Sequence, residues 1–272
     1  MILSLWLWGG VGVTGLMLLG FFIGQVRRDN SLVDILWGLA QVAGIVSALV
    51  WLGFFPKDPI FWVWGTTVFL WALRLSGHIG YRNAGKGEDP RYQGFRKSWG
   101  SHQILGALFQ VYLLQGILAM IIFVTHGVAI WGGATGSRGP GAYLFFALGL
   151  ILWIVGFVFE SLGDYQLLRF KSRKDSKGKL MTTGVWSLTR HPNYFGEACL
   201  WWGWGVGILG FGLPYPGLLG LVGPAVVTFL LLGLSGVPMT EARYAGRIDF
   251  AEYAERTNRF FPGLPKRTGK NQ

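Results

Sequence analysis

The sequence predicts an all-α membrane protein with seven transmembrane helices and an ordered polar rim at their cytoplasmic ends. Of the 272 residues, 51% are hydrophobic, 16% aromatic and only 14% charged, whereas a soluble domain has roughly 25% charged residues. Windows with almost no charge recur along the chain, each close to the about 20 residues that a helix needs to cross a bilayer. The seven windows are 1–26, 31–55, 60–81, 104–124, 141–161, 194–212 and 218–234.

The basic residues set the expected orientation of these helices. The net charge of +11 is compatible with nucleic-acid binding, but 21 of the 24 Lys and Arg residues lie in alternate loops, at 27–28, 82–97 and 169–190, and in the tail after residue 234. The positive-inside rule then places the amino terminus outside and the carboxyl tail in the cytoplasm, as in a bacterial inner-membrane protein. We therefore expect no nucleic-acid partner.

The number and spacing of the glycine, cysteine and histidine residues limit which disulfide, metal or nucleotide sites the chain can form. The chain has one cysteine, Cys199, and four scattered histidines without ligand spacing, so we predict no disulfide and no metal site. Two G-x-G-x-x-G patterns, at 10–15 and 205–210, lie inside apolar windows and not between a strand and a helix. We attribute both patterns to close helix packing. The first window lacks a basic segment before it, so we expect a retained helix and not a signal sequence.

Ionisable residues inside the windows indicate a polar cavity, because such side chains are costly in hydrocarbon. Asp34 and Gln41 are seven residues apart and share one helix face. Arg74, His78 and Tyr81 recur at helical spacing, and we expect this stripe to face the bundle interior. Asp34 and Arg74 either pair and lock two helices together or line a pocket for the polar group of an apolar ligand.

The third loop and the tail each have two interpretations. The loop carries Tyr92, which is typical of an interfacial anchor, but Glu88 and Asp89 beside Arg91 also fit a lid fixed by charge-assisted hydrogen bonds. The tail after residue 234 is an amphipathic segment that either lies on anionic lipid or folds back over the basic loop before it.

The stretch RHPNYFGE, which begins at Arg190, places polar chemistry at the start of an apolar window. Pro192 suits the first turn of a helix. Arg190 and His191 then precede a helix amino terminus, where free N–H groups favour an anion. Asn193 and Glu197 share a face, which we expect to point into the bundle. Together with the basic loop they predict a phosphate-holding rim; the alternative is a loop that contacts only lipid headgroups.

Several motifs together resemble the steroid 5-alpha-reductase family. In the second half they are the DY pair at 164–165, the basic loop, the glycine-aromatic step at 184–186, the NYFGE run at 193–197 and the tyrosine-rich tail. In the first half, SLVDILWG, WALRL and RNAGKGEDPRYQ resemble a little-characterised bacterial branch of that family. The resemblance implies a seven-helix enzyme that binds NADPH in a cytoplasm-facing cavity and reduces the carbon–carbon double bond of a 3-oxo-Δ4 steroid or similar enone lipid.

The resemblance also assigns roles to parts of the chain. Helices within 1–140 would form the substrate pocket, and 141–272 would form the cofactor-binding domain. Asp164, Asn193 and Glu197 match cofactor-binding positions of the family. Two lysines replace arginines that would hold the nucleotide phosphates, and they are Lys171 and Lys179. The other residues expected to bind the cofactor are Arg173, Arg190, His191, Tyr194, Glu241, Tyr244 and Tyr253.

The family holds the substrate carbonyl with a glutamate on the second helix and a tyrosine on the third. Here Asp34 is the nearest acid and Tyr81 the nearest tyrosine, with Tyr92 as the second choice; Arg74 completes the candidate catalytic residues. Adding hydride to the β-carbon of an enone builds negative charge on the carbonyl oxygen, which needs a donor. A protonated Asp34 or the Tyr81 hydroxyl would provide it. The expected partners are the apolar enone and membrane lipid, with no obligate protein partner.

A different class of enzyme competes with the reductase. RHPNY followed by FAEYAERTNRFFP also resembles the membrane isoprenylcysteine carboxyl methyltransferase group, whose cofactor is S-adenosylmethionine. Such an enzyme needs less phosphate-binding charge than the seven basic residues from Arg169 to Arg190 provide. A non-enzymatic lipid-binding or scaffold protein is the third possibility. The basic loop favours the reductase.

Overall fold

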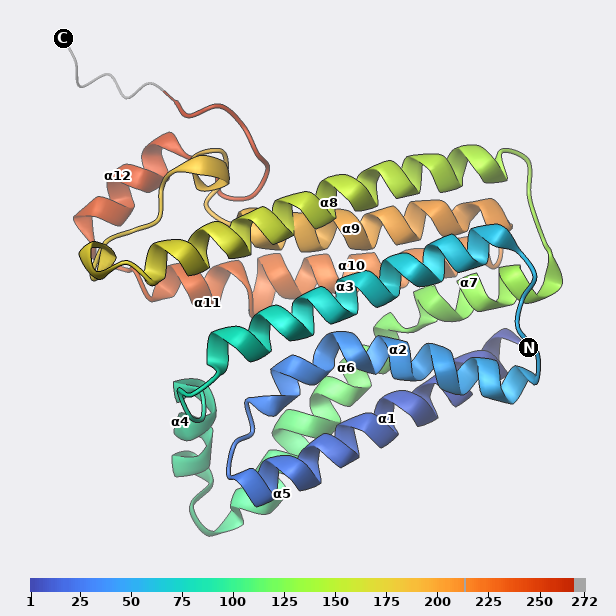
Figure 1. The fold of residues 1–272 in the computed structure, drawn as a ribbon, viewed down its shortest axis with the longest axis horizontal. Helices are drawn as coiled ribbons and strands as arrows, with labels where there is room; N and C mark the ends of the chain where they lie inside the picture. Colours follow the sequence, from blue (N-terminus) through green and yellow to red (C-terminus); the bar gives the residue numbers. More distant parts are fainter. Residues whose placement is uncertain (213, 267–272) are drawn as a thin grey trace. The chain divides into compact units, whose positions relative to one another are not determined.

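Helices joined by loops make up the part of the chain that its computed structural model describes, residues 1–212 and 214–266 (Figure 1). These residues contain no strand, which confirms the predicted all-α class. The chain divides into two compact units. The first consists of residues 1–146 and 208–223, and the second of residues 147–207 and the chain from 224 onward.

The first unit contains most of the amino-terminal helices. Its elements are α1 (Ile2–Arg27), α2 (Leu32–Leu52), α3 (Pro59–Asn83), α4 (Pro90–Trp99), η1 (Gly100–His102), α5 (Gln103–Ala107), η2 (Leu108–Leu113), α6 (Leu114–Ile122), α7 (Val124–Thr135), η5 (Leu209–Phe211) and η6 (Gly217–Leu221). Asp-Pro pairs start two of these helices. Asp58 accepts a hydrogen bond of 2.9 Å from the Ile60 N–H, and Asp89 caps α4 in the same way through Arg91, which is how short acidic side chains satisfy the free N–H groups of a first turn.

The polar residue Gln41 has a structural role in this unit. It is fully buried in α2, and its amide donates a hydrogen bond of 3.2 Å to the Ala119 carbonyl of α6. A second polar link joins α2 to α3, where the Ser76 hydroxyl donates to the Ile35 carbonyl at 2.7 Å. Such bonds hold apolar helices in register, because a buried polar group without a partner is costly.

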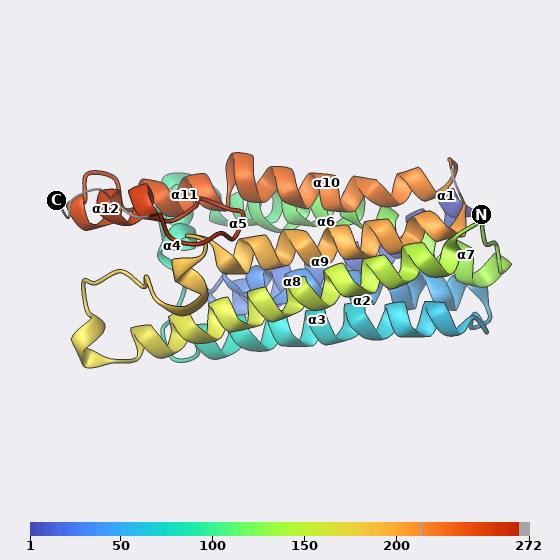
Figure 2. The same ribbon diagram turned by 90° about the horizontal axis from the view of Figure 1, so that it is seen from above.

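The second unit is organised around two long neighbouring helices. Its elements are most of α8 (Ala142–Lys171), η3 (Lys174–Ser176), η4 (Gly184–Ser187), α9 (Pro192–Ile208), α10 (Val222–Phe229), η7 (Leu230–Leu234), α11 (Val237–Ala242) and α12 (Ile248–Arg256). Figure 2 shows α8 and α9 side by side along their length. Both helices carry glycines among bulky apolar residues, and these glycines determine how closely the helices approach.

Glycines at seven-residue spacing form the contact between α8 and α9. A Cβ built on Gly149 would fall on the backbone of Gly203, and one built on Gly156 would fall on the backbone of Gly196 and Leu200. Small residues permit this backbone approach in membrane helices. The G-x-G-x-x-G pattern at 205–210 lies in α9 and η5, and the pattern at 10–15 lies within α1. Both patterns are therefore helical, as predicted.

Five helical segments are long and apolar enough to cross a membrane, and they are Ile2–Arg27, Leu32–Leu52, Pro90–Ile122, Ala142–Lys171 and Gly217–Ala242. Several long apolar helices fit an integral, multi-pass membrane protein. The windows predicted at 60–81 and 194–212 form α3 and α9, which are not among the five: α3 carries polar residues such as Arg74, and α9 has 17 residues. The seven expected spans are thus not confirmed.

Candidate functional site

Asp34 lies at the centre of a hydrogen-bonded group in the first unit. It is in the first turn of α2, where its Oδ1 accepts a hydrogen bond of 2.6 Å from the phenol of Tyr92 in α4. Its Oδ2 accepts a bond of 2.7 Å from the Arg91 guanidinium. The Gln115 amide of α6 donates a longer bond of 3.4 Å to the Tyr92 oxygen. Tyr92 is only 4% exposed, so this group places a polarised phenol in a buried position.

The two candidate catalytic residues of α3 do not join this group. Tyr81 is 73% exposed, so the stripe predicted to face the bundle interior does not extend to it. Asp34 forms its ion pair with Arg91 of α4, which is a different partner from the Arg74 of the helix-locking interpretation. Arg74 precedes the end of α3 at Asn83 by about 13 Å of helix, whereas Asp34 lies at the start of α2. Asp34 thus accepts hydrogen bonds on both of its oxygens, from Tyr92 and from Arg91.

Charge fixes the third loop to the start of α2. Glu88 accepts hydrogen bonds of 2.9 Å from the Asn30 N–H and of 2.8 Å and 3.1 Å from the Arg96 guanidinium. Burial acts to raise the pKa of Glu88, but the bonds from Arg96 and Asn30 outweigh it and hold that pKa below its ordinary value. Asp89 accepts a bond of 3.0 Å from Arg91. These bonds have the form expected for a fixed lid.

Asp164 and Asn193 meet in the second unit. The Asn193 amide donates a hydrogen bond of 3.1 Å to the Asp164 carboxylate. The Asn193 Oδ1 is buried and accepts no hydrogen bond from the residues that the structure describes. Gly163 permits the approach, because a Cβ there would lie 3.0 Å from the Asn193 nitrogen. Glu197, one turn further along α9, is half-buried on the same face, and Glu160 of α8 is 2% exposed.

Arg190 links the start of α9 to the tail. Its Nε donates a hydrogen bond of 2.9 Å to Glu241. One terminal nitrogen donates to the carbonyls of Ala254 and Thr257, at 3.1 and 3.0 Å, and the backbone N–H donates to the Asn258 carbonyl at 2.9 Å. The Arg190 side chain is 11% exposed. Its guanidinium therefore holds the tail in place, in contrast to the exposed cations of the basic loop.

Glu241 collects three cationic or basic groups. Besides Arg190, it contacts the Nε2 of His191 at 3.1 Å and the Nε of Arg259 at 3.3 Å. The His191 ring stacks on Tyr194, with centroids 5.5 Å apart, and the Tyr194 hydroxyl lies 3.1 Å from that of Thr240. Burial lowers the pKa of His191, and the bond with Glu241 offsets this only in part. His191 is thus a buried side chain whose pKa lies below its ordinary value.

The tail folds back onto the segment before α9. The phenol of Tyr253 donates a hydrogen bond to the Trp186 carbonyl, and the Trp186 indole donates to the Gly163 carbonyl at 3.1 Å. Burial raises the pKa of Tyr253. Tyr244 does not reach this segment but stacks on Phe250 at 5.3 Å. Of the two interpretations of the tail, the fold-back is the one that these bonds support.

The three predicted phosphate-binding cations of the basic loop are exposed, and they are Lys171, Arg173 and Lys179. Arg173 forms a surface ion pair of 2.7 Å with Asp175. The loop also makes contact with the tail, because Arg247 donates a hydrogen bond of 2.7 Å to the Gly178 carbonyl. The loop therefore presents charge to solvent while its end is tied to the tail.

Sequence reasoning missed three residues of these groups. Gln115 is one of two glutamines in an otherwise apolar window, and the cost of polar groups in hydrocarbon is a signal that could have found it. Thr240 and Gln166 gave no such signal. Gln166 accepts a hydrogen bond of 3.1 Å from the Val185 N–H and so fixes the glycine-aromatic step, but glutamine near a helix end is too common to be informative.

Comparison with known proteins adds a partial similarity and a family. The chain is 36% identical over 61 residues to Steroid 5-alpha-reductase DET2 of Gossypium hirsutum, a match that covers 22% of this chain and 24% of that protein. The chain thus aligns with about a quarter of this curated relative. No solved structure matches the chain. Residues 20–257 match the family model described as a protein of unknown function, DUF1295, and on this match over most of its length the chain belongs to the DUF1295 family.

Proposed function

We propose that this protein is a membrane oxidoreductase that uses NADPH to reduce the carbon–carbon double bond of an enone lipid, such as a 3-oxo-Δ4 steroid. The observation that carries the proposal is the 2.6 Å hydrogen bond between Tyr92 and Asp34. It joins a buried tyrosine to an acid on α2, the two residue types that a carbonyl site of this kind requires. The partial similarity to a steroid 5-alpha-reductase supports the same class of reaction.

In this proposal the Tyr92 hydroxyl is the donor to the substrate carbonyl. Reduction places negative charge on the carbonyl oxygen, and a hydrogen bond aimed at that oxygen lowers the barrier. When the phenol turns from Asp34 to the carbonyl, Asp34 keeps the 2.7 Å contact with Arg91 and stays neutralised. Gln115 holds the phenol oxygen from the other side. Carboxyl methylation has no need for a donor held in this way, so the pair favours the reductase over the methyltransferase.

The residues of the second unit fit a nicotinamide cofactor. A buried amide oxygen without a donor, the Oδ1 of Asn193, suits the N–H groups of a nicotinamide carboxamide, and Asp164 orients the Asn193 side chain. Exposed lysines of the basic loop, Lys171 and Lys179, would hold the phosphates. When bound, the cofactor supplies the hydride. Arg190 contributes by holding the tail against the start of α9.

A cofactor titration tests the proposal. We expect the detergent-purified protein to bind NADPH, measured by the blue shift and increase of its fluorescence, more tightly than NADH. Asn193→Ala should weaken NADPH binding by about tenfold or more, because one buried hydrogen bond is worth about 1–3 kcal/mol when its partner is left unpaired. Asn83→Ala, in the other unit, is the matched control and should bind as the wild type does.

Two results would reject the reductase. One is binding of S-adenosylmethionine with no response to NADPH, which would favour the methyltransferase. The other is an NADPH affinity that Asn193→Ala and Asn83→Ala change equally. If NADPH binds, turnover is measured as the fall in NADPH absorbance at 340 nm when an enone steroid is added. The corresponding saturated ketone is the control, because it has no carbon–carbon double bond to accept hydride.

A further inference from the structure

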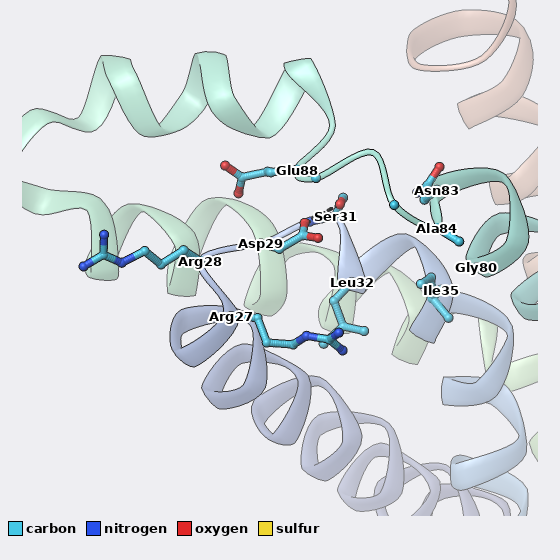
Figure 3. A pocket seen from close by; sticks show the side chains of 12 residues that line it. Arg27, Arg28, Asp29, Ser31, Leu32, Ile35, Gly80, Asn83, Ala84 and Glu88 are labelled. Carbon is cyan, nitrogen blue, oxygen red and sulfur yellow. Dashed lines mark hydrogen bonds between the residues drawn. The ribbon is translucent and has the colours of Figure 1, made fainter.

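A pocket of about 580 Å³ opens in the first unit, at the ends of three helices (Figure 3). The turn between α1 and α2, the first turn of α2, the end of α3 and the loop after it form its walls. The apolar spans Ile2–Arg27 and Leu32–Leu52 end and begin at this turn. The pocket therefore lies at the boundary between apolar helix and polar loop, and it contains none of the residues proposed for the carbonyl or the cofactor.

Only some of the charged side chains that line the pocket have a partner of opposite charge. Arg27 and Arg28 form no ion pair or side-chain hydrogen bond within the described part of the chain. Glu88 is bound by Arg96 from outside the pocket. Asp29 uses one carboxylate oxygen to accept a hydrogen bond of 2.9 Å from the Ser31 N–H. Because Arg96 neutralises Glu88, Arg27 and Arg28 stand against Asp29 alone, which leaves an excess of one positive charge at the pocket.

Backbone donors add to this positive excess. The loop after α3 has positive φ angles at Gly85 and Gly87, 73° and 72°. In the described residues the N–H groups of Gly85, Gly87 and Glu88 donate no hydrogen bond. Loops with alternating handedness turn such N–H groups toward one side and bind anions there. Figure 3 shows Arg27 reaching beside Leu32, whereas Arg28 points away from the other labelled side chains.

The remaining wall is apolar. Leu32 and Ile35 of α2 and Ala84 at the end of α3 line the pocket beside these donors. An occupant that satisfies both walls has an anionic phosphate group next to an apolar part. We propose that this pocket binds a phosphate-bearing anion through Arg27 and the free N–H groups of the glycine loop, as the headgroup of a phospholipid or as a soluble phosphate, with Arg28 adding to the positive charge of the lining.

The test measures lipid and phosphate binding to the full-length protein in detergent. In the first arm, native mass spectrometry follows a titration with phosphatidylglycerol, with a neutral diacylglycerol as the comparison. In the second arm, the shift in Tm is measured with inorganic phosphate and with pyrophosphate. Arg27→Gln with Arg28→Gln should weaken binding by roughly tenfold or more, because charge-assisted hydrogen bonds to the phosphate are lost. Lys97→Gln, an exposed cation of the same unit outside the pocket, is the control and should bind as the wild type does.

The arms separate the sources of the ligand. Saturable binding of phosphatidylglycerol with no response to phosphate identifies a lipid headgroup, and a response to phosphate that the arginine variant removes identifies a soluble ligand. Ala84→Leu fills the pocket and keeps both arginines, so it should lose binding as well, and it replaces the arginine variant if that variant does not fold. The proposal is overturned if neither ligand binds, if Lys97→Gln loses as much as the arginine variant, or if Ala84→Leu binds normally.

Discussion

The phenol of Tyr92 lies 2.6 Å from the carboxylate of Asp34, a residue 58 positions away in the sequence. The bond connects the first turn of α2 to the short helix α4, which forms much of the third loop. Arg91, the neighbour of Tyr92, binds the other oxygen of the same carboxylate. One short helix therefore supplies both partners of Asp34, so the loop that positions α4 also positions the proposed carbonyl donor.

Tyr92→Phe should separate catalysis from stability at this group. The change removes the donor proposed for the carbonyl, so kcat for enone reduction should fall about 100-fold, which is typical for losing one donor to a developing oxyanion. Stability should fall by only about 1–2 kcal/mol, because Asp34 retains Arg91. Steady-state NADPH oxidation and thermal unfolding measure the two effects. Tyr81→Phe is the control: it alters an exposed phenol and should change neither. Equal activity of the two variants would remove Tyr92 from the chemistry.

Glu241→Gln should loosen the tail. The carboxylate contacts Arg190, His191 and Arg259, and a neutral amide cannot satisfy these donors equally. We expect a loss of about 1–3 kcal/mol, toward the lower end because Glu241 is partly exposed and its interactions are screened. Thermal unfolding in detergent and faster proteolysis after Arg243 or Arg247 would detect it. Asp249→Asn, which breaks a surface pair with Arg247, should leave both measurements unchanged; a similar effect of the two variants would contradict a specific role of Glu241.

The sequence was a good guide to elements and a poor guide to partners. Charge-free windows identify helices because hydrocarbon demands apolar side chains, and α1, α2 and α3 lie close to their windows, whereas α8 continues ten residues beyond its window. Asp58-Pro59 and Asp89-Pro90 start helices as local capping chemistry requires. Which helix supplies a partner is a long-range matter. Arg74 has the right charge for the interpretation in which it pairs with Asp34 but lies deeper in α3, whereas the helix α4 brings Arg91 to Asp34.

The candidate cofactor-binding residues show the same difference between what local sequence predicts and what depends on distant segments. Asn193 and Asp164 were predicted through resemblance, and the structure joins them. Arg190 was predicted to hold a phosphate because it precedes a helix start, a local signal that is sound in itself. The tail, more than 50 residues away in the chain, supplies carbonyls and Glu241 to the same guanidinium. A pattern of neighbouring residues cannot reveal that a distant segment binds the guanidinium proposed to hold a phosphate.

Stability should decrease in acid through His191. Burial holds the pKa of this imidazole below its ordinary 6.5 in the folded protein. As the pH falls below about 6.5, the unfolded chain therefore takes up a proton that the folded protein resists, and linkage lowers the free energy of unfolding. The contribution is present above the unfolded pKa and is lost as the pH falls through the folded value. Tm measured from pH 7.5 to pH 5 should fall more steeply for the wild type than for His191→Gln; parallel curves would refute this origin.

Gly156→Ala tests the glycine contact between α8 and α9. A methyl group there would fall on the backbone of Gly196 and Leu200, which cannot rotate away as a side chain can. The two helices must separate, and overpacking of this kind costs about 1–3 kcal/mol. Gly15→Ala in α1 is the matched control, because a Cβ at Gly15 has nothing within 4 Å; alanine's higher helix propensity should leave its stability unchanged or slightly raised. Thermal unfolding in detergent compares the two. Asn193 and Asp164 lie at one end of the same contact, so Gly156→Ala should also weaken NADPH binding. If Gly156→Ala lost NADPH binding but kept the wild-type Tm, the result would point to a direct role of Gly156 in cofactor binding.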